Sequence, residues 1–79
     1  MRLDKYLKVS RLIKRRTVAN EACDAGRVTV NDKVARASYD VKVGDVIALT
    51  LGQREVKVRV TAVAETVAKN DASTLYDVL

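Results

Sequence analysis

The pattern of apolar and polar positions along the chain changes from helical to alternating near Gly26. In the first segment, Leu3, Tyr6 and Leu7 recur at the spacing of one helical face, and charged residues fill most of the other positions. This pattern predicts an amphipathic helix over about residues 3–9, with its apolar side facing the core.

A second helix is predicted after an irregular connection over residues 10–16. Thr17 is the type of residue that caps a helix N-terminus, although the third residue after it is Asn rather than the Glu or Gln of a capping box. Gly26 suits the position just beyond the helix C-terminus, which is commonly left-handed. The predicted apolar face of this helix comprises Val18, Ala19, Ala22 and Cys23.

Beyond Gly26, alternating apolar residues bounded by turn-forming residues predict short strands. The predicted hairpin over residues 28–34 turns at Asn31-Asp32, a pair typical of tight turns. Further strands are predicted at residues 46–49, 56–60 and 75–78, with a helical turn at 65–73. The expected fold class is α+β: a single domain over residues 1–79, in which two N-terminal helices pack on a small, mainly antiparallel sheet.

Positive charge is concentrated in the N-terminal part of the chain. Residues 1–36 hold ten Lys and Arg against four acids, a net charge of +6, whereas residues 37–79 hold five against six, a net of −1. The first sixteen residues alone carry seven of these cations and a single acid, Asp4. Soluble surfaces usually intersperse both signs. The asymmetry therefore predicts an anionic partner, and a cationic edge beside a helix N-terminus favours nucleic acid.

The type of cation and the scarcity of aromatic residues indicate how a nucleic acid would be recognised. Arg15 and Arg16 carry planar guanidinium groups that suit bidentate contact with phosphate, and we expect Arg16 to be the most consequential contact. The chain has three Tyr and no Phe or Trp, whereas a base-stacking platform usually groups several aromatic residues. The composition therefore favours recognition of the shape and backbone of a nucleic acid over reading of individual bases.

The composition argues against several other classes of function. With one Cys and no His, the chain offers no zinc site and no internal disulfide, and Cys23 is expected to be a buried apolar residue. The acids are scattered and no Gly-rich phosphate loop is present, so we expect no catalytic residue and no cofactor. Without a signal peptide or a membrane-spanning stretch, the protein is expected in the cytoplasm with no membrane partner.

Four motifs follow one another in the order and spacing of a known family: residues 2–7 (RLDKYL), 11–17 (RLIKRRT), 26–31 (GRVTVN) and 43–45 (VGD). Together they resemble the RNA-binding domain first described in ribosomal protein S4, also called the αL motif. The resemblance covers about residues 1–51, and the additional strands of residues 52–79 fit the small stand-alone versions of this domain. It implies the same α+β fold.

Within this family the chain is similar to stand-alone proteins of ribosome-associated quality control, which are related to a fifteen-kilodalton heat-shock protein family. The resemblance implies an RNA-binding factor rather than an enzyme, with large-subunit rRNA and tRNA on a stalled large ribosomal subunit as its partners. It implies that the protein assists the tailing of stalled nascent chains as a monomer, beside a larger tRNA-recruiting protein. We expect the chain to lack the long basic C-terminal extension of the heat-shock relatives, and this expectation favours the quality-control members.

The family's RNA surface is formed by the first helix, the turn into the second helix and the following hairpin. Carried over to matching positions, the expected RNA-binding residues are Arg2, Lys8, Arg11, Lys14, Arg15, Arg16, Thr17, Arg27, Asn31 and Lys33. One position departs from the family, which often has Gly where this chain has Asp32. A tight turn accepts Asp, but its negative charge is expected to weaken contact between RNA and the hairpin tip.

Two other interpretations remain open from the sequence. The chain could be an RNA-binding domain detached from an RNA-modifying enzyme or a tRNA synthetase. Alternatively, its basic face could meet an acidic protein, which would make it a protein–protein adaptor. The RNA that the protein recovers from cells separates the first interpretation from the quality-control role, and the RNase sensitivity of its complexes separates the second.

Overall fold

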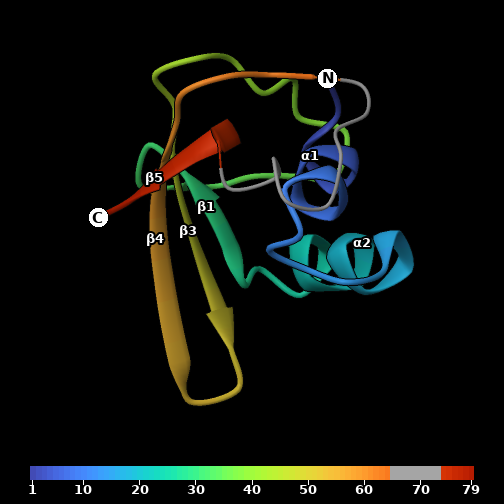
Figure 1. The fold of residues 1–79 in the computed structure, drawn as a ribbon. Helices are drawn as coiled ribbons and strands as arrows, with labels where there is room; N and C mark the ends of the chain where they lie inside the picture. The colour runs from blue at the N-terminus through green and yellow to red at the C-terminus, as the bar shows by residue number, and fades with distance from the viewer. Residues whose placement is uncertain (65–73) are drawn as a thin grey trace.

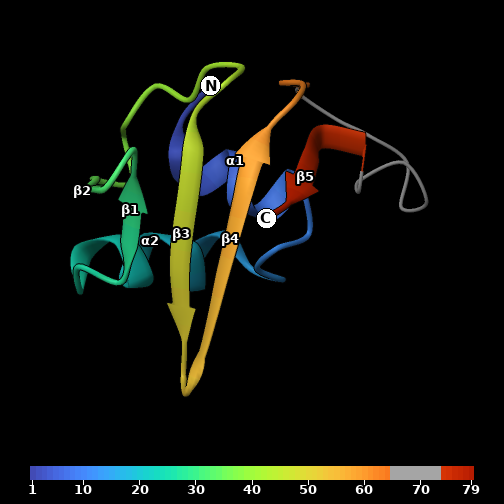
Figure 2. The same cartoon turned by 90° about the vertical axis from the view of Figure 1, so that its left-hand side faces the viewer.

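The computed structural model of the protein describes residues 1–64 and 74–79. Two helices, α1 (Leu3–Val9) and α2 (Arg16–Asp24), lie on one face of a five-stranded sheet (Figure 1). The strands are β1 (Val28–Val30), β2 (Lys33–Val34), β3 (Val46–Leu51), β4 (Arg54–Val60) and β5 (Tyr76–Val78). Their order is β2-β1-β3-β4-β5, every neighbouring pair is antiparallel, and the helices lie behind the sheet in Figure 2. The predicted α+β fold class is confirmed.

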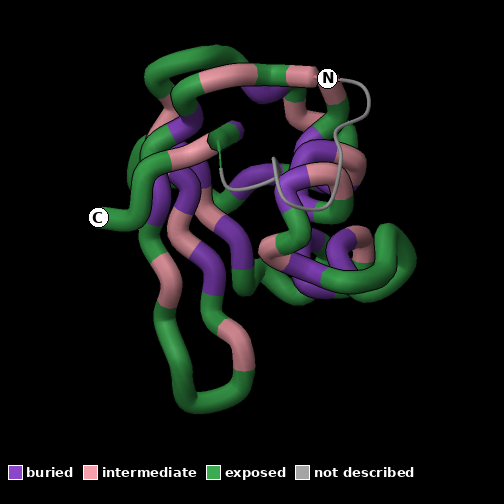
Figure 3. Tube along the Cα trace, viewed as in Figure 1, coloured by how far each residue is buried: buried purple, intermediate pink, exposed green. Residues whose placement is uncertain are grey.

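The core lies between the helices and the inner face of the sheet, where alternate strand residues are buried (Figure 3). Ile47 of β3 pairs with Val58 of β4, and both side chains are fully buried. The predicted inner face of α1 is confirmed, since Leu3, Tyr6 and Leu7 are fully buried as well. Burying one such side chain contributes about 1.5–3 kcal/mol relative to leaving it exposed. This apolar layer therefore holds α1 on the sheet.

Tyr6 also ties the end of the chain to the first helix. Its hydroxyl donates a hydrogen bond of 2.7 Å to the carbonyl of Leu75, the buried residue that precedes β5. Burial, and then the charge of the neighbouring Tyr76, raise the pKa of Tyr6, so its hydroxyl remains a donor at neutral pH. The strand predicted near residues 75–78 is confirmed as β5. The helical turn predicted at residues 65–73 lies outside the described residues.

The start of α2 differs from the prediction. Thr17 is predicted to cap this helix, but the helix begins at Arg16, and Arg15 occupies the N-cap position. The carbonyl of Arg15 accepts the first helical hydrogen bond, from the N–H of Ala19 at 3.0 Å. A threonine cap contributes only about 1 kcal/mol, whereas an ion pair between Arg16 and the buried Asp4 holds the first helical residue in place. The N-cap prediction for Thr17 is therefore wrong.

The end of α2 agrees with the prediction. Gly26 has a φ of 75°, the left-handed conformation expected just beyond a helix C-terminus. Its N–H donates to the carbonyl of Cys23 at 3.0 Å, and the N–H of Arg27 donates to the carbonyl of Ala22 at 2.9 Å. These two bonds satisfy carbonyl groups that the helix itself leaves without partners, and they turn the chain into β1.

The inner face of α2 is narrower than predicted. Ala19 and Cys23 are buried, but Val18 is 45% exposed, so its place on the apolar face is wrong. Successive residues of a helix point about 100° apart, and a helix that packs through small residues directs only a thin stripe into the core. Burial, followed by the charges of Asp4 and Asp24, raises the pKa of Cys23 to about 11. The thiol therefore stays neutral, as expected of a core residue.

The β1–β2 hairpin turns at Asn31-Asp32, as predicted. Both residues have positive φ, 53° and 69°, which is the geometry of a two-residue turn matched to strand twist. The side chain of Asn31 also fixes the turn to β3, because its Oδ1 accepts a hydrogen bond of 3.0 Å from the N–H of Val46. A second bond of 2.8 Å runs from the N–H of Asn31 to the carbonyl of Val46. The hairpin tip is therefore held against the rest of the sheet.

Replacing Asp32 with Gly is expected to raise the free energy of unfolding by about 0.5–1 kcal/mol, because Gly adopts positive φ without the steric cost of a Cβ. In a domain of this size this corresponds to a rise of about 2–8 °C in Tm, measured by thermal circular dichroism. Asp32→Ala is the control, since it removes the same charge and keeps the Cβ. A Tm for Asp32→Gly no higher than that of Asp32→Ala would contradict the role of backbone strain at this turn.

Candidate nucleic-acid interface

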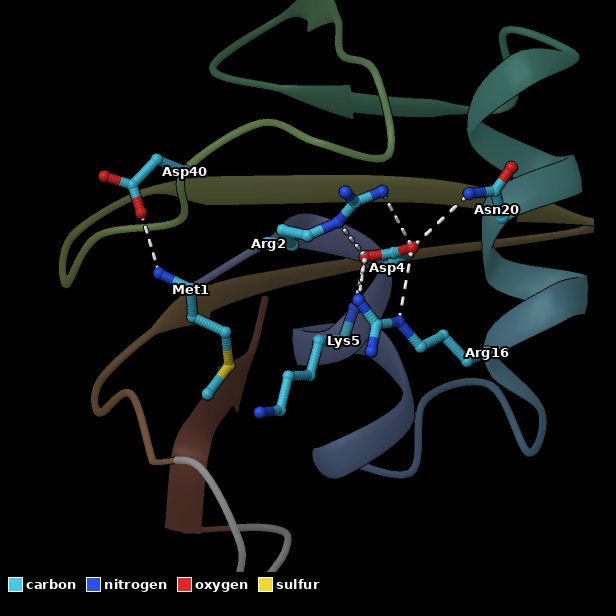
Figure 4. Close-up of polar contacts among 7 residues, drawn as sticks. All are labelled: Met1, Arg2, Asp4, Lys5, Arg16, Asn20 and Asp40. Atoms are coloured by element: carbon cyan, nitrogen blue, oxygen red, sulfur yellow. Dashed lines mark hydrogen bonds and ion pairs between the residues drawn. The ribbon is translucent and has the colours of Figure 1, made fainter.

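The carboxylate of Asp4, in the first turn of α1, holds together the positive charges at the start of both helices (Figure 4). Arg2 donates from Nε to Oδ1 at 3.2 Å and from Nη2 to Oδ2 at 3.4 Å. Arg16 places Nε 3.4 Å from Oδ2 and Nη2 3.5 Å from Oδ1. Asn20, one turn further along α2, donates to Oδ2 at 3.4 Å, and the N–H of Lys5 donates to Oδ1 at 2.8 Å. One carboxylate thereby joins α1 to α2.

The Asp4 carboxylate is charged at neutral pH although its side chain is only 3% exposed. Burial disfavours the charged form, but hydrogen bonds from Arg2, Arg16, Asn20 and the N–H of Lys5 together favour it more. The pKa of Asp4 is therefore held below its ordinary value of 3.8. Loss of either arginine would leave a buried charge only partly paired, which is costly.

Arg2 and Arg16 keep part of their hydrogen-bonding capacity beside Asp4. Their side chains are 51% (Arg2) and 48% (Arg16) exposed. A guanidinium has five N–H donors in a planar fork, and in both residues Nη1 lies outside the contacts with Asp4. A guanidinium that is already fixed by a carboxylate loses little side-chain entropy when it binds a phosphate. We call Asp4, Arg2, Arg16 and Asn20 the Asp4 cluster, in which two half-exposed guanidinium groups are held in a fixed orientation.

The backbone around Arg2 is fixed by the start of the chain. The ammonium group of Met1 lies 2.7 Å from Oδ1 of Asp40, and it holds the pKa of that carboxyl below its ordinary value. The carbonyl of Met1 accepts a hydrogen bond of 2.8 Å from the N–H of Val41. Between these contacts, Arg2 forms an isolated antiparallel bridge with Asp40. The position of Arg2 is therefore set by the loop that follows β2 as well as by Asp4.

A second group of predicted residues lies at the end of α1 and on the α1–α2 connection. Lys8, Arg11, Lys14 and Arg15 are all exposed there. Arg11 has a φ of 62°, and its N–H donates to the carbonyl of Lys8 at 3.1 Å, so an arginine ends α1 in a conformation that favours Gly. The buried side chain of Ile13 attaches this connection to the core. The connection thus presents a row of cations on a fixed backbone.

The remaining predicted residues lie apart from both groups, with one exception. Thr17 is exposed in the first turn of α2 and borders a small hollow beside the Asp4 cluster. Arg27 is exposed between α2 and β1. Asn31 and Lys33 lie in the β1–β2 hairpin, where the amide of Asn31 already donates to Oδ1 of Asp45 at 3.1 Å. Of these four residues, the structure therefore places Thr17 beside the Asp4 cluster. Arg27, Asn31 and Lys33 lie on other elements.

Asp4 and Asn20 belong to the site although they are absent from the residues predicted from the sequence. The signal for Asp4 was its position, because an acid next to Leu3 and three residues before Leu7 lies at the border of the buried face of α1. It was also the single acid among seven cations. Nothing in the sequence spacing indicates that α2 would bring Arg16 to the same carboxylate, because that contact depends on how the two helices pack.

Residues 1–64 and 74–79 contain no group of three or more His, Cys, Asp or Glu side chains that could hold a metal ion. Over the same part of the chain, no helix is long and apolar enough to cross a membrane. The surface described above presents exposed cationic side chains, of which Arg2 and Arg16 are fixed by the Asp4 carboxylate.

Fold and site together define a class of protein: a small α+β domain whose helices present fixed guanidinium groups of the kind that bind phosphate. Residues 1–47 match the S4 domain, and the chain belongs to the S4 domain family. An RQC P-site tRNA stabilizing factor from Halalkalibacterium halodurans is 60% identical over 78 residues, which span 99% of this chain and 89% of that protein. The protein of the same name from Bacillus subtilis is 51% identical over 79 residues, which span 100% and 92%.

A solved structure supports the same relationship. Heat shock protein 15 of Vibrio cholerae superposes with a TM-score of 0.93 at 29% identity, covering 100% of this chain and 81% of that one. The relation to the fifteen-kilodalton heat-shock family, expected from the sequence, is confirmed. The Vibrio protein is trimeric in its structure, and the expectation that the present chain is a monomer stays a prediction.

The contribution of Asp4 to the free energy of unfolding is expected to fall as the pH is lowered. Because the folded-state pKa of Asp4 lies below its ordinary value, its stabilisation is fully present above about pH 4–5 and is lost as the pH falls through the lower, folded-state pKa. The free energy of unfolding of Asp4→Asn should be about 1–2 kcal/mol below that of the wild type at pH 7. This difference should shrink below about pH 4.

Urea unfolding of both proteins at several pH values measures this difference. Asp24→Asn is the control, because Asp24 is an exposed acid at the other end of α2. A difference between wild type and Asp4→Asn that stays constant down to pH 2 would show that the charge of Asp4 is not what stabilises the cluster.

Arg11→Gly is expected to separate RNA binding from stability. Gly relieves the positive φ of residue 11, so the free energy of unfolding should be unchanged or rise by up to about 1 kcal/mol. Loss of one phosphate contact should reduce the salt dependence of RNA binding, the slope of log affinity against log salt, by about 0.7–0.9. Fluorescence anisotropy at several salt concentrations measures this slope. Arg59→Gln is the control, because it removes an exposed cation on β4. Equal slopes for the two variants would exclude Arg11 from the interface.

Proposed function

We propose that the protein binds rRNA of the large ribosomal subunit together with P-site tRNA, and that it stabilises this tRNA while a stalled nascent chain is extended without a template. The observation that carries the proposal is the Asp4 cluster, in a chain 60% identical over 99% of its length to a protein named RQC P-site tRNA stabilizing factor. The S4 domain match over residues 1–47 covers both helices and the β1–β2 hairpin.

The proposed interface works through phosphates. The Asp4 cluster supplies guanidinium groups that are already oriented, and the α1–α2 connection supplies Arg11, Lys14 and Arg15. Charge-assisted and bidentate contacts of this kind are about twice as strong as neutral hydrogen bonds. Phosphate contacts fix the register of an RNA against a protein and carry little sequence information. The interface would therefore hold RNA by its shape and backbone.

In this role the protein makes and breaks no covalent bond. Its contribution is to hold a tRNA in a fixed position against the rRNA by contacts with both backbones. The chemistry of chain extension then belongs to the ribosome and to a larger tRNA-recruiting protein, which we propose as the second partner. The site of action is the cytoplasm, where stalled large subunits occur.

Cross-linking in living cells tests the proposal. The tagged protein is cross-linked to RNA, purified under denaturing conditions and the attached RNA is sequenced. Large-subunit rRNA recovered together with tRNA supports the proposal. Recovery of a single class of tRNA would favour a domain detached from an enzyme, and complexes that resist RNase and contain no RNA would favour a protein adaptor.

Arg16 is expected to act through its planar fork as well as its charge. Arg16→Lys keeps the charge and loses the bidentate geometry, so its affinity for RNA should fall nearly as far as that of Arg16→Ala, by about tenfold in each case. Affinity is measured by fluorescence anisotropy, with circular dichroism to verify the fold. Arg59→Lys serves as the conservative control. An Arg16→Ala variant with intact fold and wild-type affinity would remove Arg16 from the interface.

The salt dependence of binding provides an independent measurement. If about five cations neutralise phosphates, the slope of log affinity against log salt should lie between about −3.5 and −4.5. Raising the salt concentration from about 50 to 200 mM should then weaken binding on the order of a hundredfold. A nearly flat dependence would contradict an interface built from phosphate contacts.

A further inference from the structure

A hollow separate from the Asp4 cluster lies between the β1–β2 hairpin and the segment that follows it, residues 35–39. It combines an apolar floor of Val30 and Ala35, two exposed cations, Lys33 and Arg36, and the aromatic ring of Tyr39. The rest of its lining is Val34, which is 66% exposed, and the polar residues Asn31 and Ser38. Val30 and Ala35 are buried, whereas the Lys33 and Arg36 side chains belong to exposed residues. Neither Arg36 nor Tyr39 belongs to the RNA-binding set predicted from the sequence.

The two sides of this hollow are tied together by the carboxylate of Asp45. Its Oδ1 accepts a hydrogen bond from the amide of Asn31 at 3.1 Å, on the hairpin side. Its Oδ2 accepts one from the hydroxyl of Tyr39 at 3.2 Å, on the loop side, and another from the N–H of Lys42 at 3.0 Å. Burial and then the hydrogen bond to Asp45 raise the pKa of Tyr39, so its hydroxyl stays protonated and continues to donate at neutral pH. The aromatic ring is therefore held in position before any ligand arrives.

The hollow is also fixed relative to the Asp4 cluster. The N–H of Leu3 donates to the carbonyl of Tyr39 at 2.8 Å, and the N–H of Asp4 donates to the carbonyl of Ala37 at 3.1 Å. The loop that carries Tyr39 and Arg36 therefore runs along the start of α1, where Arg2 and Asp4 lie.

We propose that this hollow accepts a single unstacked nucleotide of a single-stranded or looped RNA segment. Its base would lie against the Tyr39 ring and the apolar floor, and its phosphate would contact Lys33 and Arg36. This inference rests on the proposed function, since it adds a contact to the same RNA.

The chemistry of the hollow matches a nucleotide in both of its parts. A base is flat and weakly polar on its faces, and it stacks on aromatic side chains with an energy large enough to affect affinity. A phosphate is an anion, and the exposed side chains beside the apolar floor are cationic. The nearby acid of the hairpin turn, Asp32, is not among the residues that line the hollow. A base within a duplex has both faces stacked and cannot enter, so the hollow selects for unpaired RNA.

Photochemical cross-linking of the wild-type protein tests this assignment without a mutation. The probe is a fluorescein-labelled RNA octamer of uridines with 5-iodouridine at one position, because iodouridine reacts with adjacent aromatic side chains on irradiation. The chain has only three tyrosines, of which Tyr6 is fully buried and Tyr76 lies on β5. We expect the adduct on Tyr39, identified by mass spectrometry of the peptides.

Affinities for two probes then measure the contribution of the hollow. The octamer is compared with a blunt RNA duplex, which can bind by phosphates but cannot insert a base. Tyr39→Ala should weaken octamer binding by about five- to a hundredfold and duplex binding by less than about twofold. Arg36→Gln changes an exposed residue and leaves the core intact, so it should weaken octamer binding in a fully folded protein. Arg59→Gln is its matched control.

The outcomes separate this inference from the proposed function. An adduct on Tyr76 alone, or equal loss of octamer and duplex binding in Tyr39→Ala and Arg36→Gln, would overturn the nucleotide site while the proposed function stands. If the wild-type protein bound neither the octamer nor the duplex, both the nucleotide site and the proposed function would be overturned. Displacement of the octamer by uridine 5′-monophosphate at micromolar concentration would assign the hollow to a free nucleotide instead of an RNA strand.

Discussion

The contact on which this structure depends is the one between the Asp4 carboxylate and the arginines that flank it. A carboxylate that is 3% exposed costs free energy unless its charge is balanced, and here donors from both helices supply that balance. Since Arg16 and Asn20 belong to α2, the charge of Asp4 is satisfied only when α2 packs correctly on α1. The same contacts orient two guanidinium groups at the surface. Stability and binding capacity therefore arise from one set of atoms.

A second carboxylate, that of Asp45, joins two loops by accepting hydrogen bonds from both. Asp45 accepts hydrogen bonds from the side chains of Asn31 and Tyr39 and thereby joins the β1–β2 hairpin to the loop that follows it. The Gly-Asp pair at residues 44–45 is thus more than a turn, because its acid organises residues that lie far away in the sequence. In both places a negative charge fixes the surface that is expected to meet an anionic partner.

The two organised regions are joined through the backbone. The N–H groups of Leu3 and Asp4 donate to carbonyls of the loop over residues 37–39, so backbone hydrogen bonds hold the start of α1 against the loop that carries Tyr39. A surface whose groups are held in place before binding pays less entropy when it holds an RNA backbone. Such a surface suits a factor whose proposed task is to keep a tRNA in place rather than to transform it.

The sequence by itself determined most of the helices and strands, the fold class and the sign of the charge expected of the partner. Helical spacing at Leu3, Tyr6 and Leu7, alternation in β4 and the Asn31-Asp32 turn depend on local geometry, and local geometry is written in neighbouring residues. The concentration of cations in the first sixteen residues is likewise a property of the sequence.

The tertiary structure decided which side chains are buried and which residues contact one another. The first residue of α2 and the exposure of Val18 depend on how one helix packs on another, which no local pattern specifies. The same is true of the pairing of Asp4 with Arg16, twelve positions away, and of Asp45 with Asn31, fourteen positions away. Sequence patterns sum short-range preferences, whereas a buried charge is satisfied by whichever donors the folded chain brings to it. The cations of the candidate interface could therefore be named from the sequence, and their arrangement in space could not.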